Sequence, residues 1–364
     1  MEFTLSDEQQ DLQTAVRGFV ADRGTDEARR VWDGEQGFDD ATWAQMVDLG
    51  WTGLLVPEAH GGLGLGLVDA AVVLEEMGRA VFPGPFLSSA ILATMAAHRL
   101  GLADRLESLA AGTSRGTIAI EEKGAGSTVD RVRTRAVRKS GQWRLTGLKV
   151  VVLDGGSADW CLVAARTEHG LGTFLVEAPD AQVVPSWDQS RKVTRLDLDG
   201  RVGEPVGPDG DHTAIWRRVV DDGAVALCAE MLGAMQGAHE VAVEYAKTRV
   251  QFGRPIAKFQ VIRHKAVDML HRIELSRVGA HYAAWASDVD DAKREEAVAM
   301  AKGYCGEAAN FVCAESIQIH GGVGFTWDCD AHLFYRRCKQ NDLMLGFQSW
   351  QRRRLGELVL APSS

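Results

Sequence analysis

The sequence predicts a mostly α-helical protein with a β domain in its middle, because the residue pattern changes twice along the chain. Apolar residues recur at helical spacing until about Gly112. From Thr117 to about Leu198 the segments are short, β-branched and separated by turn residues, which is typical of a compact antiparallel β domain. Helical spacing returns near Asp211. We therefore predict a helical domain, a β domain and a C-terminal helical bundle over residues 1–112, 113–206 and 207–364.

The N-terminal domain begins with a helix predicted over residues 5–24. Ser6 and Gln9 have the spacing of a capping box, in which each side chain accepts a hydrogen bond from the other residue's backbone N–H. Gly50, the glycines of 61–66 and the segment 83–85 interrupt the helical pattern further on. The additional helices are predicted over residues 39–49, 68–79, 87–100 and 103–111.

The β domain is predicted from β-branched runs that turn residues bound on both sides. These runs cover residues 117–120, 131–137, 143–145, 150–153, 160–165, 172–176 and 193–198.

The connection over residues 245–260, YAKTRVQFGRPIAKFQ, joins two long helical patterns. Gly253 and Pro255 break the helical pattern there, as a connection between helices requires. One interpretation is a plain helical hairpin in which Arg249 extends its charge to solvent and Phe252 fills the core.

A second segment, QIHGGVGF over 318–325, favours another interpretation. Its paired glycines, Gly321 and Gly322, let a backbone approach a ligand closely and expose N–H groups, which suits a pyrophosphate. An arginine that pairs with phosphate and an aromatic that covers a ring would complete a candidate nucleotide cradle.

Composition and charge narrow the classes of function. Hydrophobic residues make up 46% and charged residues 25%, as in ordinary soluble globular proteins. The net charge of −10 argues against nucleic acid as a partner and requires basic side chains to gather wherever a phosphate binds. The six cysteines show no metal-binding spacing, so we expect reduced core cysteines and no metal. We find no signal peptide or long apolar run and expect a cytoplasmic protein without a membrane span.

At these motifs the chain resembles the acyl-CoA dehydrogenase family. RVQFGRPIAKFQ and QIHGGVGF are similar to that family's flavin-binding signatures. Further matches are LLVPEAHGGLGLGLVDAAVVLEEMG at 54–78, EKGAGST at 122–128 and GLKVVVLDGGSADWCLVAART at 147–167. The resemblance covers essentially the whole chain. It implies the family's fold of an N-terminal α domain, an antiparallel β domain and a C-terminal four-helix bundle, together with FAD and acyl-CoA chemistry.

The resemblance also implies a tetramer whose C-terminal bundles form the centre. The flavin ring would lie between the β domain and the bundle of one subunit, and a neighbouring subunit would hold the adenine end. Ser127 matches a residue that could reach the pyrophosphate, and an electron-transfer flavoprotein is the implied electron acceptor. The residues that match the adenine-end contacts are Arg249, Gln251, Phe252, Gln260, Gln318, Gly321 and Gly322.

The chain departs from the family where the reaction needs a base. Removing the proton alpha to a thioester while a hydride leaves the beta carbon requires a carboxylate opposite the flavin ring. The resemblance places this glutamate at one of two positions, which Gly223 and Leu345 occupy here, and neither can accept a proton. Asp222 and Asp221 immediately precede Gly223 and are the weaker candidates. The alternative interpretation of these two acids is an acidic first turn of a helix.

The positions expected to contact the flavin ring differ as well. Glu121 stands where the family usually has a threonine, and Val151 and Leu153 stand where it commonly has tryptophan and threonine. Residues expected at the adenine end are therefore present, whereas those expected to hold the ring or to take the proton are absent.

Three hypotheses follow. The first is an FAD-contributing subunit of a heterotetrameric acyl-CoA dehydrogenase, similar to the base-lacking subunit of the α2β2 enzymes of actinobacterial steroid catabolism, whose second subunit carries the base. The second is a homotetrameric flavoenzyme with a relocated base at Asp222 or Asp221. The third is a non-enzymatic acyl-CoA-binding or scaffold protein.

Overall fold

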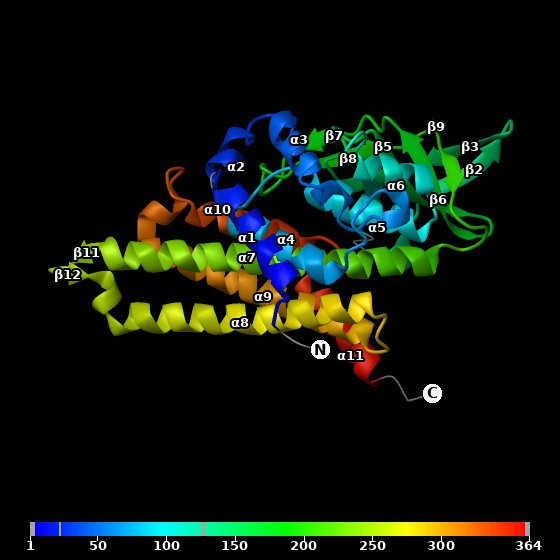
Figure 1. The fold of residues 1–364 in the computed structure, drawn as a ribbon. Coiled ribbons are helices and arrows are strands. Elements are labelled where there is room, and N and C mark those ends of the chain that lie inside the picture. Colours follow the sequence, from blue (N-terminus) through cyan, green and yellow to red (C-terminus); the bar gives the residue numbers. More distant parts are fainter. Residues whose placement is uncertain (1–3, 22, 125–127, 361–364) are drawn as a thin grey trace. The chain divides into compact units, whose positions relative to one another are not determined.

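The computed structural model describes residues 4–21, 23–124 and 128–360 (Figure 1). The chain divides into two compact units, which are described in turn. Unit 1 contains the described residues up to Ala28, the segment Leu67–Phe82 and the described residues from Ala224 onward; unit 2 contains Arg29–Gly66 and Pro83–Gly223. The predicted fold class is confirmed, with helices first, then strands, then long helices.

The first helix forms as the capping box predicts. α1 spans Asp7–Ala21. The Gln9 N–H donates to Ser6 Oγ at 3.2 Å, and the Ser6 N–H donates to Gln9 Oε1 at 3.1 Å. Both bonds satisfy N–H groups that would otherwise have no partner at the start of the helix.

Long helices make up most of the rest of unit 1, and the part of α7 up to Gly223 belongs to unit 2. α4 spans Leu67–Arg79 and packs on α1, while α9 packs on α8, α10 and α11. The bounds are α7 Thr213–Thr248, α8 Gln260–Asp288, α9 Arg294–His320, α10 Ala331–Leu343 and α11 Gln348–Leu360. Asp221 and Asp222 lie about two turns inside α7, so the expectation that they form the first turn of a helix is wrong.

Glycines bring α4 and α7 together until their backbones touch. A Cβ at Gly233 would lie 1.7 Å from the Glu75 carbonyl oxygen, and a Cβ at Gly78 would lie 2.1 Å from the Glu230 carbonyl oxygen. No side chain fits at either position, so glycine is required for this close approach even though it weakens a helix interior.

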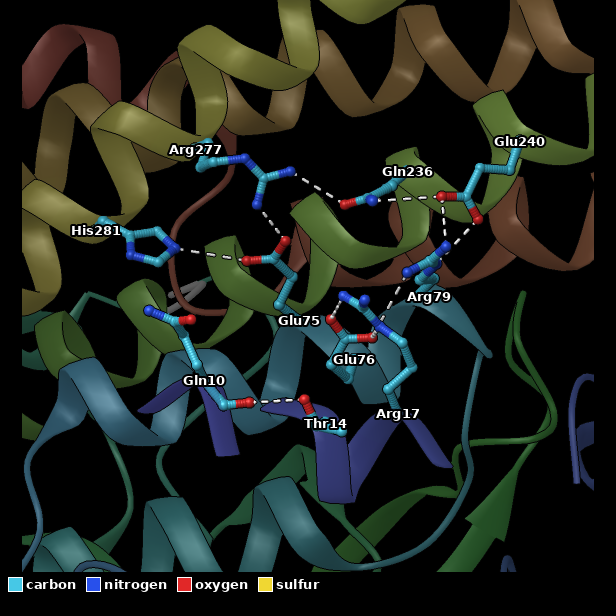
Figure 2. A network of polar contacts seen from close by, with 10 residues as sticks. All are labelled: Gln10, Thr14, Arg17, Glu75, Glu76, Arg79, Gln236, Glu240, Arg277 and His281. Atoms are coloured by element: carbon cyan, nitrogen blue, oxygen red, sulfur yellow. Dashed lines mark hydrogen bonds and ion pairs between the residues drawn. The ribbon is translucent and has the colours of Figure 1, made fainter. Parts of the chain in front are cut away.

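Two consecutive carboxylates on α4, Glu75 and Glu76, are almost fully buried and need counter-charges. Figure 2 shows them among side chains of neighbouring helices. Glu75 pairs with Arg277 and lies 3.4 Å from His281 Nε2, and both partners come from α8. Glu76 accepts hydrogen bonds from Arg17 of α1 at 2.6 and 3.0 Å. The two acids thus tie α1 and α8 to α4.

Unit 2 contains shorter helices and the strands. α3 spans Asp40–Asp48, and α6 spans Ala103–Ala110. The helix predicted over 87–100 is present in two pieces, a π-helix over Phe86–Ala93 followed by α5 over Thr94–Arg99. The short helix α2, Asp26–Arg30, begins in unit 1 and ends in unit 2, and it was not predicted.

The described strands of unit 2 form two sheets. One has the order β10-β6-β5-β2-β3-β9, with β1 also paired to β5, and the other has the order β4-β8-β7. Most pairs are antiparallel as predicted, but β5 runs parallel to β1 and to β2. The bounds are β1 Gly116–Ala119, β2 Arg135–Lys139, β3 Gln142–Thr146, β4 Leu148–Leu153, β5 Trp160–Thr167, β6 Gly170–Glu177, β7 Gln182–Val184, β8 Val193–Asp197, β9 Arg201–Val202 and β10 Glu204–Val206.

The cysteines are all buried with free thiols, in agreement with the prediction of core cysteines. In the ranges given above, no helix is both long enough and apolar enough to cross a membrane. Within those same residues, no group of three or more His, Cys, Asp or Glu side chains is arranged to hold a metal ion.

The Glu75 carboxylate makes unit 1 sensitive to acid. Burial alone would raise the pKa of Glu75, but His281 and Arg277 outweigh burial and hold that pKa below its ordinary value of 4.5. A lowered pKa stabilises the fold above about pH 4.5, and this contribution is lost as the pH falls through the lowered pKa. We expect Glu75→Gln to reduce the free energy of unfolding by about 3 kcal/mol near pH 7, because Arg277 loses its buried partner.

Urea unfolding of the wild type and Glu75→Gln over a series of pH values measures this effect. The difference between the two proteins should shrink below about pH 4, and a difference independent of pH would contradict the role given to Glu75. Glu244→Gln is the matched control, since its exposed carboxylate lies 3.6 Å from Lys247 and should contribute less than about 1 kcal/mol.

Candidate functional site

The two predicted ligand-binding segments lie at the same end of unit 1. Ser316 Oγ of α9 donates to the Ala238 carbonyl of α7 at 2.8 Å. Further along both helices, the rings of Tyr245 and His320 stack with centroids 4.5 Å apart. α7 and α9 therefore run in the same direction and end together. We call residues 249–260 and 318–325, which lie at these two helix ends, the motif end.

The first segment of the motif end forms a β-hairpin, which was not predicted. β11, Val250–Gln251, pairs antiparallel with β12, Arg254–Pro255, where α7 ends and α8 begins (Figure 1). Phe252 and Gly253 form the turn, and both have positive φ, 53° and 75°, as in a type I′ turn. The Phe252 side chain is 89% exposed, so the interpretation in which it fills this chain's core is wrong. An exposed aromatic in the left-handed region is unusual and marks a candidate binding residue.

The motif end gathers the positive charge that an acidic protein needs in order to bind phosphate. Residues 249–260 contain three Lys or Arg, Arg249, Arg254 and Lys258, and no Asp or Glu. Arg254 lies over the Phe259 ring at 4.4 Å, and Arg263 Nε donates to the Ala257 carbonyl at 2.9 Å. Arg249 is exposed beside them. The surface therefore suits an anionic ligand that also has an apolar or aromatic part.

The second segment of the motif end leaves a stretch of backbone uncovered. Gly321 has φ of 66°, and among the described residues a Cβ at either Gly321 or Gly322 would meet no atom within 4 Å. Gln318, on the last turn of α9, is exposed. A ligand could therefore approach this backbone without displacing any side chain of the chain itself.

All the residues expected at the adenine end of FAD are exposed at the motif end. They are Arg249, Gln251, Phe252, Gln260, Gln318, Gly321 and Gly322. Their charge, amide groups and open backbone fit a dinucleotide pyrophosphate and its ribose. Ser127 lies outside the described residues.

The residues expected to contact the flavin ring lie in unit 2 and fit that ring poorly. Glu121 and Val151 form an isolated antiparallel bridge, in which the Val150 N–H donates to the Glu121 carbonyl at 3.0 Å. Glu121 and Leu153 are buried, with exposures of 8% and 7%. Val151 and Leu153 have only hydrocarbon side chains, which cannot donate hydrogen bonds to the polar edge of a flavin.

A buried ion pair beside Glu121 was missed by the sequence reasoning. Lys149 Nζ lies 2.7 Å from Glu122 Oε1, and Glu122 also accepts bonds from the Thr134 hydroxyl at 2.6 Å and N–H at 3.0 Å. Burial lowers the pKa of Lys149 to about 8 despite this carboxylate. The signal was available, since a lysine inside the β-branched run of β4 needs a counter-charge. The pair holds the segment that carries Glu121 against β4.

At one of the two positions expected for the base, the backbone is unusual although the side chain is inert. Leu345 is buried with φ of 51°, and Gly346 after it has φ of 92°. Gln351 Nε2 donates to the Leu345 carbonyl at 3.4 Å. A left-handed leucine costs about 1–2 kcal/mol, so the surrounding structure must hold it in place.

At the other expected position, Gly223 lies inside α7, and the adjacent Asp222 is held by two arginines. Its Oδ2 accepts from Arg99 Nη2 at 2.7 Å, and both of its oxygens lie 3.0 Å from Arg218 Nε. Asp222 and Asp221 are each only 2% exposed. The Asp222 carboxylate is therefore occupied by an ion pair, which explains its burial without a role in proton transfer.

Comparison with known proteins identifies the family to which these features belong. Sequence models of the acyl-CoA dehydrogenase N-terminal and C-terminal domains match residues 6–104 and 212–360. The chain is 31% identical to the acyl-CoA dehydrogenase IpdE2 of Mycobacterium tuberculosis over 92% of each protein. The chain thus belongs to the acyl-CoA dehydrogenase family.

Two similar solved structures are each named after two proteins. A chain of the ChsE4-ChsE5 complex from Mycobacterium tuberculosis aligns with a TM-score of 0.90 and 30% identity over the full length of both chains. A chain from a variant of the Tcur3481-Tcur3483 steroid ACAD aligns with a TM-score of 0.88 and 32% identity over 98% of both chains.

The arginine pair predicts a structural role for Asp222. We expect Asp222→Asn to lower the free energy of unfolding by about 2 kcal/mol, because Arg99 and Arg218 lose their shared counter-charge; Arg99 is partly exposed, which reduces the loss. Asp130→Asn is the control, since it breaks a pair of similar length, 2.7 Å to Arg217, at an exposed position. Chemical unfolding of both variants measures the effect, and equal stabilities would contradict this role.

Proposed function

We propose that this chain is the FAD-contributing subunit of a heterotetrameric acyl-CoA dehydrogenase, and that a second subunit carries the catalytic base. The observation that carries the proposal is a separation of roles. Residues that match the adenine end of the FAD site form an exposed surface in unit 1. Of the residues that match the ring contacts and the base, Val151, Leu153 and Leu345 are hydrocarbon, Gly223 has no side chain and Glu121 is a buried acid. The nearby Asp222 belongs to a buried ion pair.

The exposure of the motif end supports donation to a neighbour. A residue that binds a ligand held within its own subunit is expected to line a pocket of that subunit. Phe252 instead extends into solvent. Such a large apolar side chain gains most when another molecule covers it. Arg249 would pair with phosphate oxygens, and the amides of Gln251 and Gln318 would supply hydrogen bonds.

The chemistry follows from this division. When bound, FAD would supply the acceptor for the hydride that leaves the beta carbon of the acyl thioester. This chain would bind and orient the adenine end of the cofactor, and the proton alpha to the thioester would be taken by a carboxylate of the second subunit. Neither Gly223 nor Leu345 can take that proton.

The similar proteins support the choice of partner and substrate class. ChsE4-ChsE5 and Tcur3481-Tcur3483 are named as pairs, and the second is described as a steroid ACAD. We extend this to a steroid-derived acyl-CoA as substrate. An electron-transfer flavoprotein is the electron acceptor that membership of the family implies.

FAD binding tests the proposal. We expect the purified chain alone to bind little FAD, and the chain mixed with its base-carrying partner to bind about one FAD per pair of chains, because each site needs residues from both. Titration followed by flavin absorbance gives the ratio. In the mixture, Arg249→Ala should lower occupancy, whereas Arg217→Ala, an exposed arginine in unit 2, should not. One tightly held FAD per protomer of the chain alone would overturn the proposal.

Turnover of the assembled complex tests the alternative base. If the partner supplies the carboxylate, Asp222→Asn in this chain should leave the rate within about threefold of wild type once the complex has formed. A fall of roughly 10²–10⁴-fold would identify Asp222 as a general base and contradict the assignment of the base to the partner.

A further inference from the structure

We propose that the stacked pair Tyr245 and His320 positions the two segments of the motif end relative to each other, so that they present one cofactor-contributing surface. The inference rests on the proposed function and assigns roles to two residues that make no contact with the cofactor in that proposal. The segments come from different helix ends, so neither fixes the location of the other through the chain itself.

Each residue of the pair lies on its helix shortly before one of the two segments. The Arg249 N–H donates to the Tyr245 carbonyl at 2.8 Å, which places the tyrosine one turn before the hairpin. His320 immediately precedes Gly321. The rings are 4.5 Å apart and inclined by 29°, an offset-stacked geometry that stabilises aromatic pairs. A shift at this pair therefore moves Arg249 and the glycine backbone relative to each other.

The histidine ring is held by its own helix. His320 is 8% exposed, and its Nδ1 lies 2.8 Å from the Ser316 carbonyl oxygen. Since a carbonyl can only accept, Nδ1 carries the proton and the ring orientation is fixed. Tyr245 thus packs against a rigid surface rather than a rotating side chain.

Other contacts keep the helices together without this pair. Ser316 bonds the Ala238 carbonyl deeper in the unit, and Lys265 near the start of α8 pairs with Glu315 of α9. Loss of the stack should therefore release only the last turns. The helices below should stay packed.

The hairpin also holds its own shape. Phe252 and Phe259 meet edge to face with centroids 6.1 Å apart, and Arg254 covers Phe259. The hairpin can therefore tilt as a body while its internal geometry persists. Its orientation toward Gly321 and Gly322 depends on the Tyr245–His320 stack, and binding that needs both segments weakens when that orientation is lost.

The test measures FAD affinity of the complex assembled with the base-carrying partner. Tyr245→Ala and His320→Ala should each weaken FAD binding roughly 3- to 10-fold, the range expected for one aromatic pair. Tyr245→Phe keeps the ring and should bind within about twofold of wild type. The double variant, Tyr245→Ala with His320→Ala, should bind FAD as tightly as the single variant that has the lower FAD affinity, because each single change already removes the same stack.

A second stack in the same unit supplies the matched control. Tyr282 and Trp285 of α8 lie 5.9 Å apart at 24°, so Tyr282→Ala removes a similar contact away from the motif end and should leave FAD affinity unchanged. Suppose that the wild-type complex binds FAD. If the alanine variants then bind FAD with the wild-type affinity, or if the losses of affinity in the two single variants add in the double variant, the positioning role is wrong and the proposed function stands. If the wild-type complex binds no FAD, both are wrong.

Discussion

The close contact between α4 and α7 is the constraint on which the rest of unit 1 depends. Once glycines let these backbones touch, the neighbouring carboxylates have no access to water and must be neutralised inside the unit. Glu230 therefore pairs with Arg337 at 2.7 Å, and both side chains are essentially inaccessible to solvent. Arg337 Nη1 also donates to the Phe82 carbonyl at 3.1 Å. Each acid thus links α7 or α4 to a different element, and the helices acquire a fixed register.

A fixed register makes an exposed binding surface possible. Loops that hold ligands gain affinity when a rigid scaffold positions them, since less conformational entropy is lost on binding. The motif end sits on three packed helix termini, and its hairpin is braced by Phe259 and Arg254. Its local positive charge within a protein of net charge −10 adds attraction for an anionic ligand and separates this end from the acidic remainder of the surface.

The sequence predicted well what local patterns determine. The capping box of Ser6 and Gln9, the helix that follows and the order of helices and strands were predicted because each depends on residues close together in the chain.

The hairpin at Phe252 was not predicted. Its turn places phenylalanine at positive φ, where rules for turns expect asparagine, aspartate or glycine. The antiparallel pairing of Val250 with Pro255 and of Gln251 with Arg254 closes this turn in spite of that local preference, and strands of two residues are too short to give a sequence pattern. Pairings between distant residues were missed for a related reason: Asp222 with Arg99, and Glu122 with Lys149, involve charges that the chain brings together only after folding. Sequence shows that a buried charge needs a partner but does not show which one. The candidate site residues were found because their motifs resemble those of the family. Their contribution to an FAD site remains a prediction.

Two left-handed residues show how the same backbone feature leads to different chemistry. Phe252 and Leu345 have nearly equal φ, 53° and 51°, and both conformations are unfavourable for their side chains. Phe252 is 89% exposed, so its strained turn presents a ring outward, where a partner molecule can cover it. Leu345 is 5% exposed, so its strained turn presents hydrocarbon to the interior. The backbone at 345 could direct a carboxylate, but the side chain removes the proton acceptor. The same backbone conformation therefore exposes an aromatic ring at one turn and buries an aliphatic side chain at the other.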